Sequence, residues 1–133
     1  PVRSYGKPVV VTEFGCCTYA GAENAGSMGW NVIDRDSRPW RLRKPLVRDE
    51  DAQANHLTEL LTLFENEALE GAFVFTFVSP SYPSSENPEY DQDVASFSIV
   101  RTWKQRETSR SPLQQKPKQA VHEIARYYGD HIM

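Results

Sequence analysis

The chain has 133 residues, of which 39% are hydrophobic and 25% are charged, and this composition is typical of a folded globular domain. The net charge of −3 makes nucleic acid and anionic membranes poor partners, because no positive field covers the chain as a whole. No segment approaches the roughly 18 consecutive apolar residues of a membrane span, and the N-terminus lacks the basic-then-apolar layout of a signal peptide.

The cysteine content favours a reducing compartment. Cys16 and Cys17 are the only two cysteines, and adjacent residues cannot join distant parts of a chain. We therefore expect a soluble, cytoplasmic protein. Two interpretations of the pair stay open: small side chains packed beneath a loop, or a strained vicinal disulfide or reactive thiol.

A strand is predicted near the start of the chain. Val9, Val10 and Val11 form a continuous β-branched run that ends at Glu13-Phe14-Gly15. An unbroken apolar run of this kind is typical of a parallel strand buried on both faces. Residues 16–48 sustain neither a helical nor a strand period, so we expect a long loop there.

A helix is predicted after this loop. Acidic residues at positions 49–51 can cap its N-terminus and oppose its dipole. Leu57, Leu60, Leu61 and Phe64 follow at spacings of three and four, so one apolar stripe can pack against a sheet.

A second buried strand is predicted from Ala72 to Val78, which is rich in aromatic and β-branched residues. Alternate residues point to the same side of a strand, so Phe73, Phe75 and Phe77 share one face, and we interpret them as core side chains. Strand, helix and strand together form a βαβ unit with parallel strands.

The remaining segments alternate between loop and regular structure. Residues 80–93 are rich in Pro, Ser, Asn and Asp and should form a loop, whereas residues 95–100 suit a short extended segment. Residues 101–116 are polar and somewhat basic, and we interpret them as a solvated connection. Nucleic-acid binding is disfavoured there because Trp103 is the only aromatic residue among the charges.

A closing helix is predicted after this connection, with Pro117 as its first residue and Gly129 at its end. Its buried stripe comprises Ala120, Val121, Ile124, Ala125 and Tyr128. The resulting order is strand, helix, strand, helix, which predicts an α/β fold. Two strands cannot close a barrel of eight, which needs roughly 250 residues. The chain begins with Pro, so we treat residues 1–133 as one partial domain of a longer protein.

Glu13 is the leading candidate for catalysis. Active sites of parallel α/β folds gather at the C-terminal ends of the strands, and Glu13 stands at such an end, before a long aromatic loop. A carboxylate held there suits a nucleophile or general base. The alternative is a solvated or salt-bridged side chain.

Three stretches of the sequence resemble clan A glycoside hydrolases, which are retaining (β/α)₈-barrel enzymes. The segment 6–15, Gly-Lys-Pro-Val-Val-Val-Thr-Glu-Phe-Gly, resembles their seventh strand, and Glu70 to Phe77 is similar to their eighth. Pro117 to Ala120 and the pair Tyr127-Tyr128 look like the start and end of their last helix. More closely, segments 12–19 and 90–96 resemble bacterial proteins labelled "abortive infection protein", although no residue here indicates a phage-defence chemistry.

The resemblance implies that the chain is the C-terminal β-α-β-α portion of a TIM (β/α)₈ barrel, with Glu13 as the nucleophile of a double displacement. The family's acid/base lies at the end of the fourth strand, which this chain does not contain, so we expect the fragment alone to be inactive. The enzymes commonly place a Trp near the end of strand eight as a sugar platform, where this sequence has Phe73, Phe75 and Phe77. A sugar platform is therefore the alternative to the core interpretation of these rings. The alternatives are a non-catalytic carbohydrate-binding or interaction module, or a small α/β domain that binds a partner through its strand edge.

Aromatic and acidic loop residues are the candidate saccharide ligands. Tyr19, Trp30 and Tyr82 could stack on sugar rings, and Asp91 and Asp93 could accept hydrogen bonds from sugar hydroxyls. Trp40 and Tyr90 have the same potential. Loop anchoring is the alternative for the aromatic residues, and local turn bonds are the alternative for the aspartates. No cofactor is expected, and no metal, because His56, His122 and His131 have no metal-binding spacing.

Overall fold

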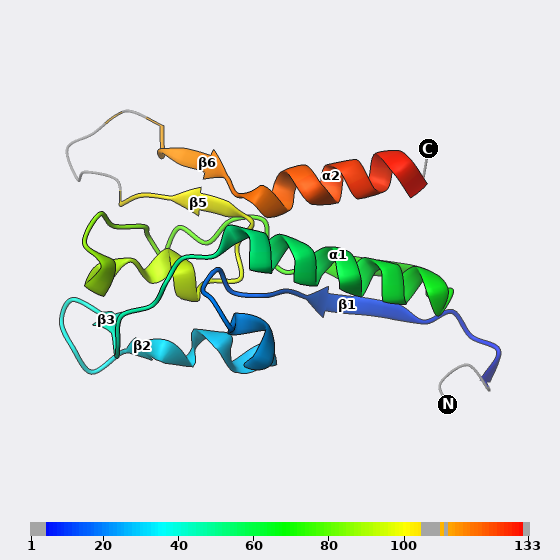
Figure 1. Cartoon of the computed structure of the whole chain (residues 1–133), viewed down its shortest axis with the longest axis horizontal. Helices are drawn as coiled ribbons and strands as arrows, with labels where there is room; N and C mark the ends of the chain where they lie inside the picture. The colour runs from blue at the N-terminus through cyan, green and yellow to red at the C-terminus, as the bar shows by residue number, and fades with distance from the viewer. Residues whose placement is uncertain (1–4, 105–109, 111, 132–133) are drawn as a thin grey trace.

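Two parallel strands and two α-helices form the frame of the protein, whose computed structural model describes residues 5–104, 110 and 112–131 (Figure 1). In chain order these elements are β1 (Val10–Phe14), α1 (Glu50–Asn66), β4 (Gly71–Val74) and α2 (Gln119–His131). β1 and β4 pair in parallel, with Val10 opposite Gly71 and Val11 opposite Ala72. The predicted order and the α/β class are confirmed, and the described residues form no closed barrel.

Short elements fill the connections between these four. They are the 3₁₀ helices η2 (Ala22–Asn24), η3 (Gly26–Val32), η4 (Pro88–Tyr90) and η5 (Gln92–Ala95), and the strands β2 (Ile33–Asp34), β3 (Arg41–Leu42), β5 (Val100–Thr102) and β6 (Gln115–Pro117). β2 pairs with β3 and β5 with β6, each in antiparallel register. The expected loop of residues 16–48 therefore contains two 3₁₀ helices and a small hairpin.

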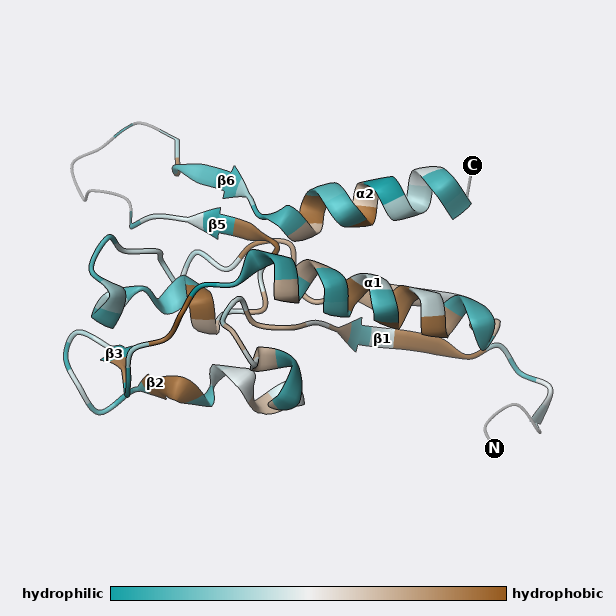
Figure 2. Cartoon of the chain, in the orientation of Figure 1, coloured by the Kyte–Doolittle hydropathy of each residue, from teal (hydrophilic) through white to brown (hydrophobic). Residues whose placement is uncertain are grey.

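α1 forms as its sequence predicts. The Asp49 carboxylate accepts a hydrogen bond from the backbone N–H of Ala52 at 2.8 Å, which caps the helix N-terminus. Leu57 and Leu61 are buried, and Leu60 and Phe64 pack against the core beside them. Figure 2 shows hydrophobic and hydrophilic positions alternating along α1. Neither α1 nor α2, the two α-helices of the described chain, has the length and apolar character of a membrane span.

β1 is not buried on both faces, so that prediction is wrong. Phe14 packs edge-on against Phe64 of α1, with ring centroids 5.2 Å apart, and is buried. Val10 is 44% exposed. β1 has one partner strand in the described chain, and its other side carries no covering layer there.

The second strand is shorter than predicted. Phe75 still donates its N–H to the carbonyl of Phe14 in β1, but from Thr76 onward the backbone bonds to residues 97–100. The N–H of Thr76 donates to the carbonyl of Phe97 at 3.1 Å, and the N–H of Val100 donates to the carbonyl of Phe77 at 3.0 Å. Phe73 and Phe77 are 62% and 61% exposed, and Phe75 is 43% exposed. All three are exposed in the described chain, so their interpretation as core residues is wrong there.

The C-terminal third also departs from the prediction. The expected solvated connection contains the β5–β6 hairpin, although its residues 105–109 and 111 lie outside the described chain. Pro117 ends β6, and α2 begins at Gln119 and continues past Gly129.

The closing helix buries a narrower stripe than its sequence suggested. Ala120 and Ile124 are buried and Val121 is half-buried, whereas Ala125 and Tyr128 are exposed. α2 packs against α1, so a single neighbouring helix defines its covered face.

A buried ion-pair network, which we name the Asp93 cluster, joins four segments of the chain. It comprises Asp93, Lys118, Arg48, Asp91 and Thr18. The Lys118 ammonium lies 3.0 Å from the Asp93 carboxylate and donates to the Thr18 hydroxyl at 2.8 Å. Arg48 bridges Asp93 and Asp91, with N to O distances of 2.9 Å to each. Lys118 is 0% and Asp93 1% exposed, so their attraction acts with little screening by water.

Burial controls the ionisation of this cluster. It lowers the pKa of the Lys118 ammonium, and the attraction of Asp93 offsets only part of that effect. Burial also acts to lower the pKa of Arg48, but its hydrogen bonds and attraction to Asp91 and Asp93 outweigh burial and raise it. Lys118 therefore depends on Asp93 to remain charged inside the protein.

Gln53 of α1 fastens the same region through its side-chain amide. Its N–H groups donate to the backbone carbonyls of Cys16 at 2.8 Å and Ser98 at 3.1 Å, and the residue is fully buried. The two carbonyls belong to irregular backbone, which has no ladder partner at these positions, so the amide satisfies groups that would be costly to bury unpaired.

Replacing Asp93 with Asn should lower the free energy of unfolding by about 3–5 kcal/mol, because the buried Lys118 ammonium would lose its carboxylate partner. Chemical denaturation followed by circular dichroism measures this change. Asp130→Asn is the matched control: Asp130 is exposed on α2, and its neutralisation should alter stability by less than about 0.5 kcal/mol. A loss for Asp93→Asn no larger than the control's would contradict the role given to the ion pair.

Candidate functional site

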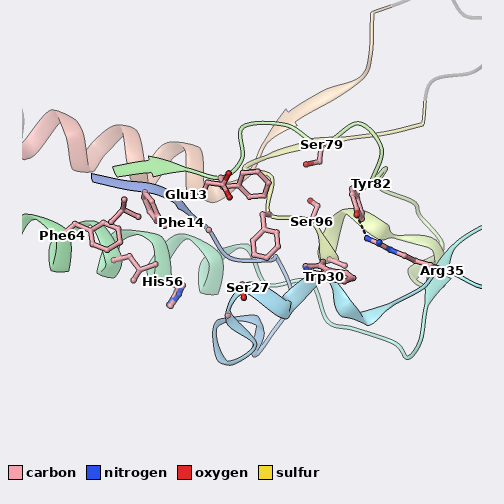
Figure 3. Close-up of a pocket in the computed structure, with 17 residues that line it drawn as sticks. Glu13, Phe14, Ser27, Trp30, Arg35, His56, Phe64, Ser79, Tyr82 and Ser96 are labelled. Atoms are coloured by element: carbon pink, nitrogen blue, oxygen red, sulfur yellow. Dashed lines mark hydrogen bonds between the residues drawn. The ribbon is translucent and has the colours of Figure 1, made fainter. Parts of the chain in front are cut away.

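A pocket of about 670 Å³ opens beside the carboxyl end of β1 (Figure 3). The side chains in its wall that carry charge, hydrogen-bonding groups or aromatic surface include Glu13, Trp30, Arg35, His56, Phe75 and Tyr82. They come from β1, η3, the β2–β3 connection, α1 and the segment after β4. Residues distant in sequence thus converge at the rim where parallel α/β folds place their sites.

Glu13 is the one carboxylate among the described residues that line this pocket. It is the penultimate residue of β1, is exposed, and makes no hydrogen bond or ion pair with any described residue. The salt-bridged alternative is therefore not realised in the described chain. A strand holds the backbone of Glu13, while its carboxylate is free to meet a ligand.

The backbone beside Glu13 approaches that of Phe75 closely. A Cβ atom at position 15 would lie 2.1 Å from the carbonyl oxygen of Phe75, so Gly15 is required at this position. The N–H of Phe75 also donates to the carbonyl of Phe14 at 2.7 Å. These contacts place the Phe75 ring in the same pocket as the carboxylate.

Trp30 and Tyr82, two of the predicted saccharide ligands, both line the pocket. Arg35 links them: its guanidinium carbon lies 4.7 Å from the Trp30 ring centroid, and its Nη2 donates to the Tyr82 hydroxyl at 2.8 Å. The same guanidinium carbon lies 5.3 Å from the ring centroid of Trp40. Trp40 itself does not line the pocket.

The other predicted ligands lie outside the pocket. Tyr19 is buried, and its hydroxyl donates to the carbonyl of Gly29 at 3.0 Å, so it anchors the loop. Burial also raises the pKa of its hydroxyl. Tyr90 is half-buried in η4 and does not line the pocket. Asp91 and Asp93 are buried in the Asp93 cluster, where Arg48 and Lys118 occupy their oxygens.

Arg35, Phe75 and His56 line the pocket, although the sequence does not assign them to the site. Arg35 lies between Trp30 and Trp40, and that spacing in an aromatic loop was a signal that could have marked it. For Phe75, strand alternation favours a core position shared with Phe73 and Phe77 over a position in the site. His56 lies on the half-buried flank of α1, and no local pattern distinguished it.

Comparison of the sequence with known proteins finds no match to a family model and none to a curated protein. Within the described ranges, no group of three or more His, Cys, Asp and Glu side chains gathers around a position for a metal ion. The geometry itself therefore defines the site as an accessible carboxylate in a pocket that also holds aromatic rings and one guanidinium.

The two cysteines that follow Glu13 lie beneath the pocket loop as free thiols. Cys17 donates to the carbonyl of Ala95 at 3.3 Å, and a Cβ atom at position 29 would lie 2.8 Å from its sulfur, so Gly29 makes room for it. Burial raises the pKa of Cys16 from the ordinary 9.0 to about 11 and that of Cys17 to about 12. This arrangement favours the packing interpretation over a reactive thiol or vicinal disulfide.

We expect neither thiol of the native protein to be alkylated by iodoacetamide at about pH 8, because only the thiolate is nucleophilic and both groups stay protonated there. Mass spectrometry after treatment of native and urea-unfolded protein checks this expectation. Labelling of both samples to the same extent would contradict it.

The same pKa shifts predict that stability falls at alkaline pH. Above about pH 9 the unfolded chain loses thiol protons that native Cys16 and Cys17 retain until their pKa values of about 11 and about 12. The native state then binds more protons, so rising pH favours unfolding. Thermal unfolding of a variant with Ala at both positions should show a shallower alkaline slope, and an unchanged slope would count against the shifts.

Proposed function

We propose that the chain forms the nucleophile-bearing part of a glycosidase site that hydrolyses or transfers a β-linked saccharide with retention. The observation that carries this proposal is the Glu13 carboxylate, free of described partners at the carboxyl end of a parallel strand, in a pocket with aromatic walls. A rigid strand suits an attacking group, and aromatic rings offer a ligand large apolar surfaces.

The fold proposal accompanies this function: the chain is the C-terminal β-α-β-α portion of a (β/α)₈ barrel. Three features support it. β1 and β4 pair in parallel across a helical connection, Glu13 lies at the rim where barrel enzymes carry their catalytic groups, and the uncovered side of the strands bears Phe73 and Phe77. In a barrel this side would contact the remaining strands.

The proposed reaction is a double displacement. A Glu13 oxygen attacks the anomeric carbon and forms an ester, while the bond from that carbon to the leaving oxygen breaks and a second carboxyl group protonates that oxygen. The second group then takes a proton from water, or from an acceptor sugar, as this nucleophile breaks the ester. Such pairs lie about 5–5.5 Å apart, and Glu13 is the one carboxylate lining the described pocket, so we place the acid/base outside the described residues.

A non-catalytic carbohydrate-binding module is the second candidate. The observation that favours it is the same solitary carboxylate, because a single acid in a pocket with Trp30, Phe75 and Tyr82 can hold a sugar without cleaving it. Formation of a covalent intermediate on Glu13 separates the two functions.

Covalent labelling with dinitrophenyl fluoroglycosides of the gluco, galacto and manno series tests the nucleophile. Dinitrophenolate leaves without a proton, so the ester can form in this chain without the acid/base. We expect the mass of one fluoroglycosyl group on the peptide that contains Glu13 with at least one probe. Ordinary unactivated glycosides should not be turned over by the chain alone, because their leaving oxygen needs the missing acid.

Two variants control this experiment. Glu13→Gln should keep the native circular dichroism spectrum and lose labelling altogether, whereas Glu23→Gln, at an exposed position outside the pocket, should label as the unaltered chain does. Undiminished labelling of Glu13→Gln would remove Glu13 from the nucleophile's role. Saccharide binding without labelling by any probe would instead support the binding module.

A further inference from the structure

Arg35 brings a positive charge to a pocket whose other charged group with a proposed role is the Glu13 carboxylate. It lies between β2 and β3, is exposed, and lines the pocket. Figure 3 shows Glu13 and Arg35 well apart, with Arg35 on the side of Tyr82. The pocket therefore has an anionic end and a cationic end.

The guanidinium is held in place by neutral groups. Its carbon lies 4.7 Å from the Trp30 ring centroid and 5.3 Å from that of Trp40, and its Nη2 donates to the Tyr82 hydroxyl. Ring contacts engage the face of a guanidinium and leave its N–H groups pointing outward in the plane. The geometry is thus fixed before any ligand arrives.

The charge of Arg35 is not neutralised within the described chain. No described carboxylate lies within ion-pair distance of it, and the bond to Tyr82 is its one described side-chain hydrogen bond. Arg41, on the neighbouring strand, differs in this respect because Asp34 and Glu89 pair with it. A guanidinium has five N–H donors, so Arg35 retains donors for a planar anion.

The segment of the sequence around Arg35 is rich in positive charge. Residues 33–44 contain five basic and two acidic side chains, although the whole chain has a net charge of −3. Arg35 thus belongs to a locally basic segment of the sequence, and such an excess of positive charge favours an anionic ligand over a neutral one.

We propose that the pocket selects an acidic saccharide, a sugar that carries a carboxylate, and that Arg35 binds this carboxylate through paired N–H donors. This inference rests on the proposed saccharide function. Glu13 repels an anion, so the sugar unit that carries the carboxylate lies at the Arg35 end, while the anomeric carbon of another unit of the saccharide faces Glu13. The aromatic rings of Trp30 and Phe75 supply the apolar surface between the two ends.

Matched pairs of methyl β-glycosides test the selectivity. The probes are the glucoside, galactoside and mannoside, each with the uronide that differs only by a carboxylate in place of the hydroxymethyl group. We expect calorimetric titration to show at least one uronide bound about tenfold or more tightly than its neutral partner, the effect of one charge-assisted pair. Added salt should reduce this preference.

Variants of the basic segment assign the effect to one side chain. Arg35→Gln should abolish the preference while neutral-sugar binding persists, and Arg35→Lys should recover only part of it, because an ammonium lacks the planar fork. Arg43→Gln is the matched control, since Arg43 is exposed in the same segment and does not line this pocket. It should preserve the preference.

The outcomes separate this inference from the function on which it rests. Neutral sugars bound as tightly as every uronide would overturn acidic selectivity and leave saccharide binding in place. A preference that Arg43→Gln removes as fully as Arg35→Gln would overturn the role of Arg35. Failure of every probe to bind would overturn both the inference and the saccharide function. The comparison of paired probes on the unaltered chain stands even if Arg35→Gln does not fold.

Discussion

The ion pair between Lys118 and Asp93 is the interaction on which the arrangement of this protein depends. Both groups are almost wholly buried, and a buried charge without its partner is costly, so the start of α2 must meet the segment that contains Asp93. Arg48, just before α1, pairs with Asp93, and Thr18, in the loop after β1, accepts a hydrogen bond from Lys118. These two segments must therefore meet the ion pair as well. One cluster therefore positions four segments. This matters because the strands of the described chain are short and align few of these segments by themselves.

The Asp93 cluster also helps to fix the position of one wall of the pocket. Asp93 is fixed by its ion pairs with Arg48 and Lys118, and residues 95–97, which begin two positions later, line the pocket. Gln53 ties Cys16 and Ser98 together beneath the same wall. Asp91 and Asp93 therefore contribute to the pocket indirectly, by fixing the backbone that forms part of its wall.

The pocket divides its chemistry between opposite ends. Glu13 offers a carboxylate on a strand, and Arg35 offers a guanidinium held against indole rings, so each charged group is oriented by a different kind of support. Aromatic side chains lie between them and give a ligand apolar contact. Under the proposed function, such a site would orient a saccharide with one reactive end and one anionic end, and double displacement would require a further carboxyl group opposite Glu13.

The sequence by itself determined the local features of this protein: β1 from its valine run, α1 from its acidic cap and leucine stripe, and Glu13 at a strand end. Each rests on residues within a few positions of one another. Only the tertiary structure decided that Asp93 is buried, that Phe75 and Arg35 join Glu13 in a pocket, and that β4 ends at Val74. These outcomes depend on partners far along the chain, such as Lys118 for Asp93 and Phe97 for Thr76, whose positions no local period encodes.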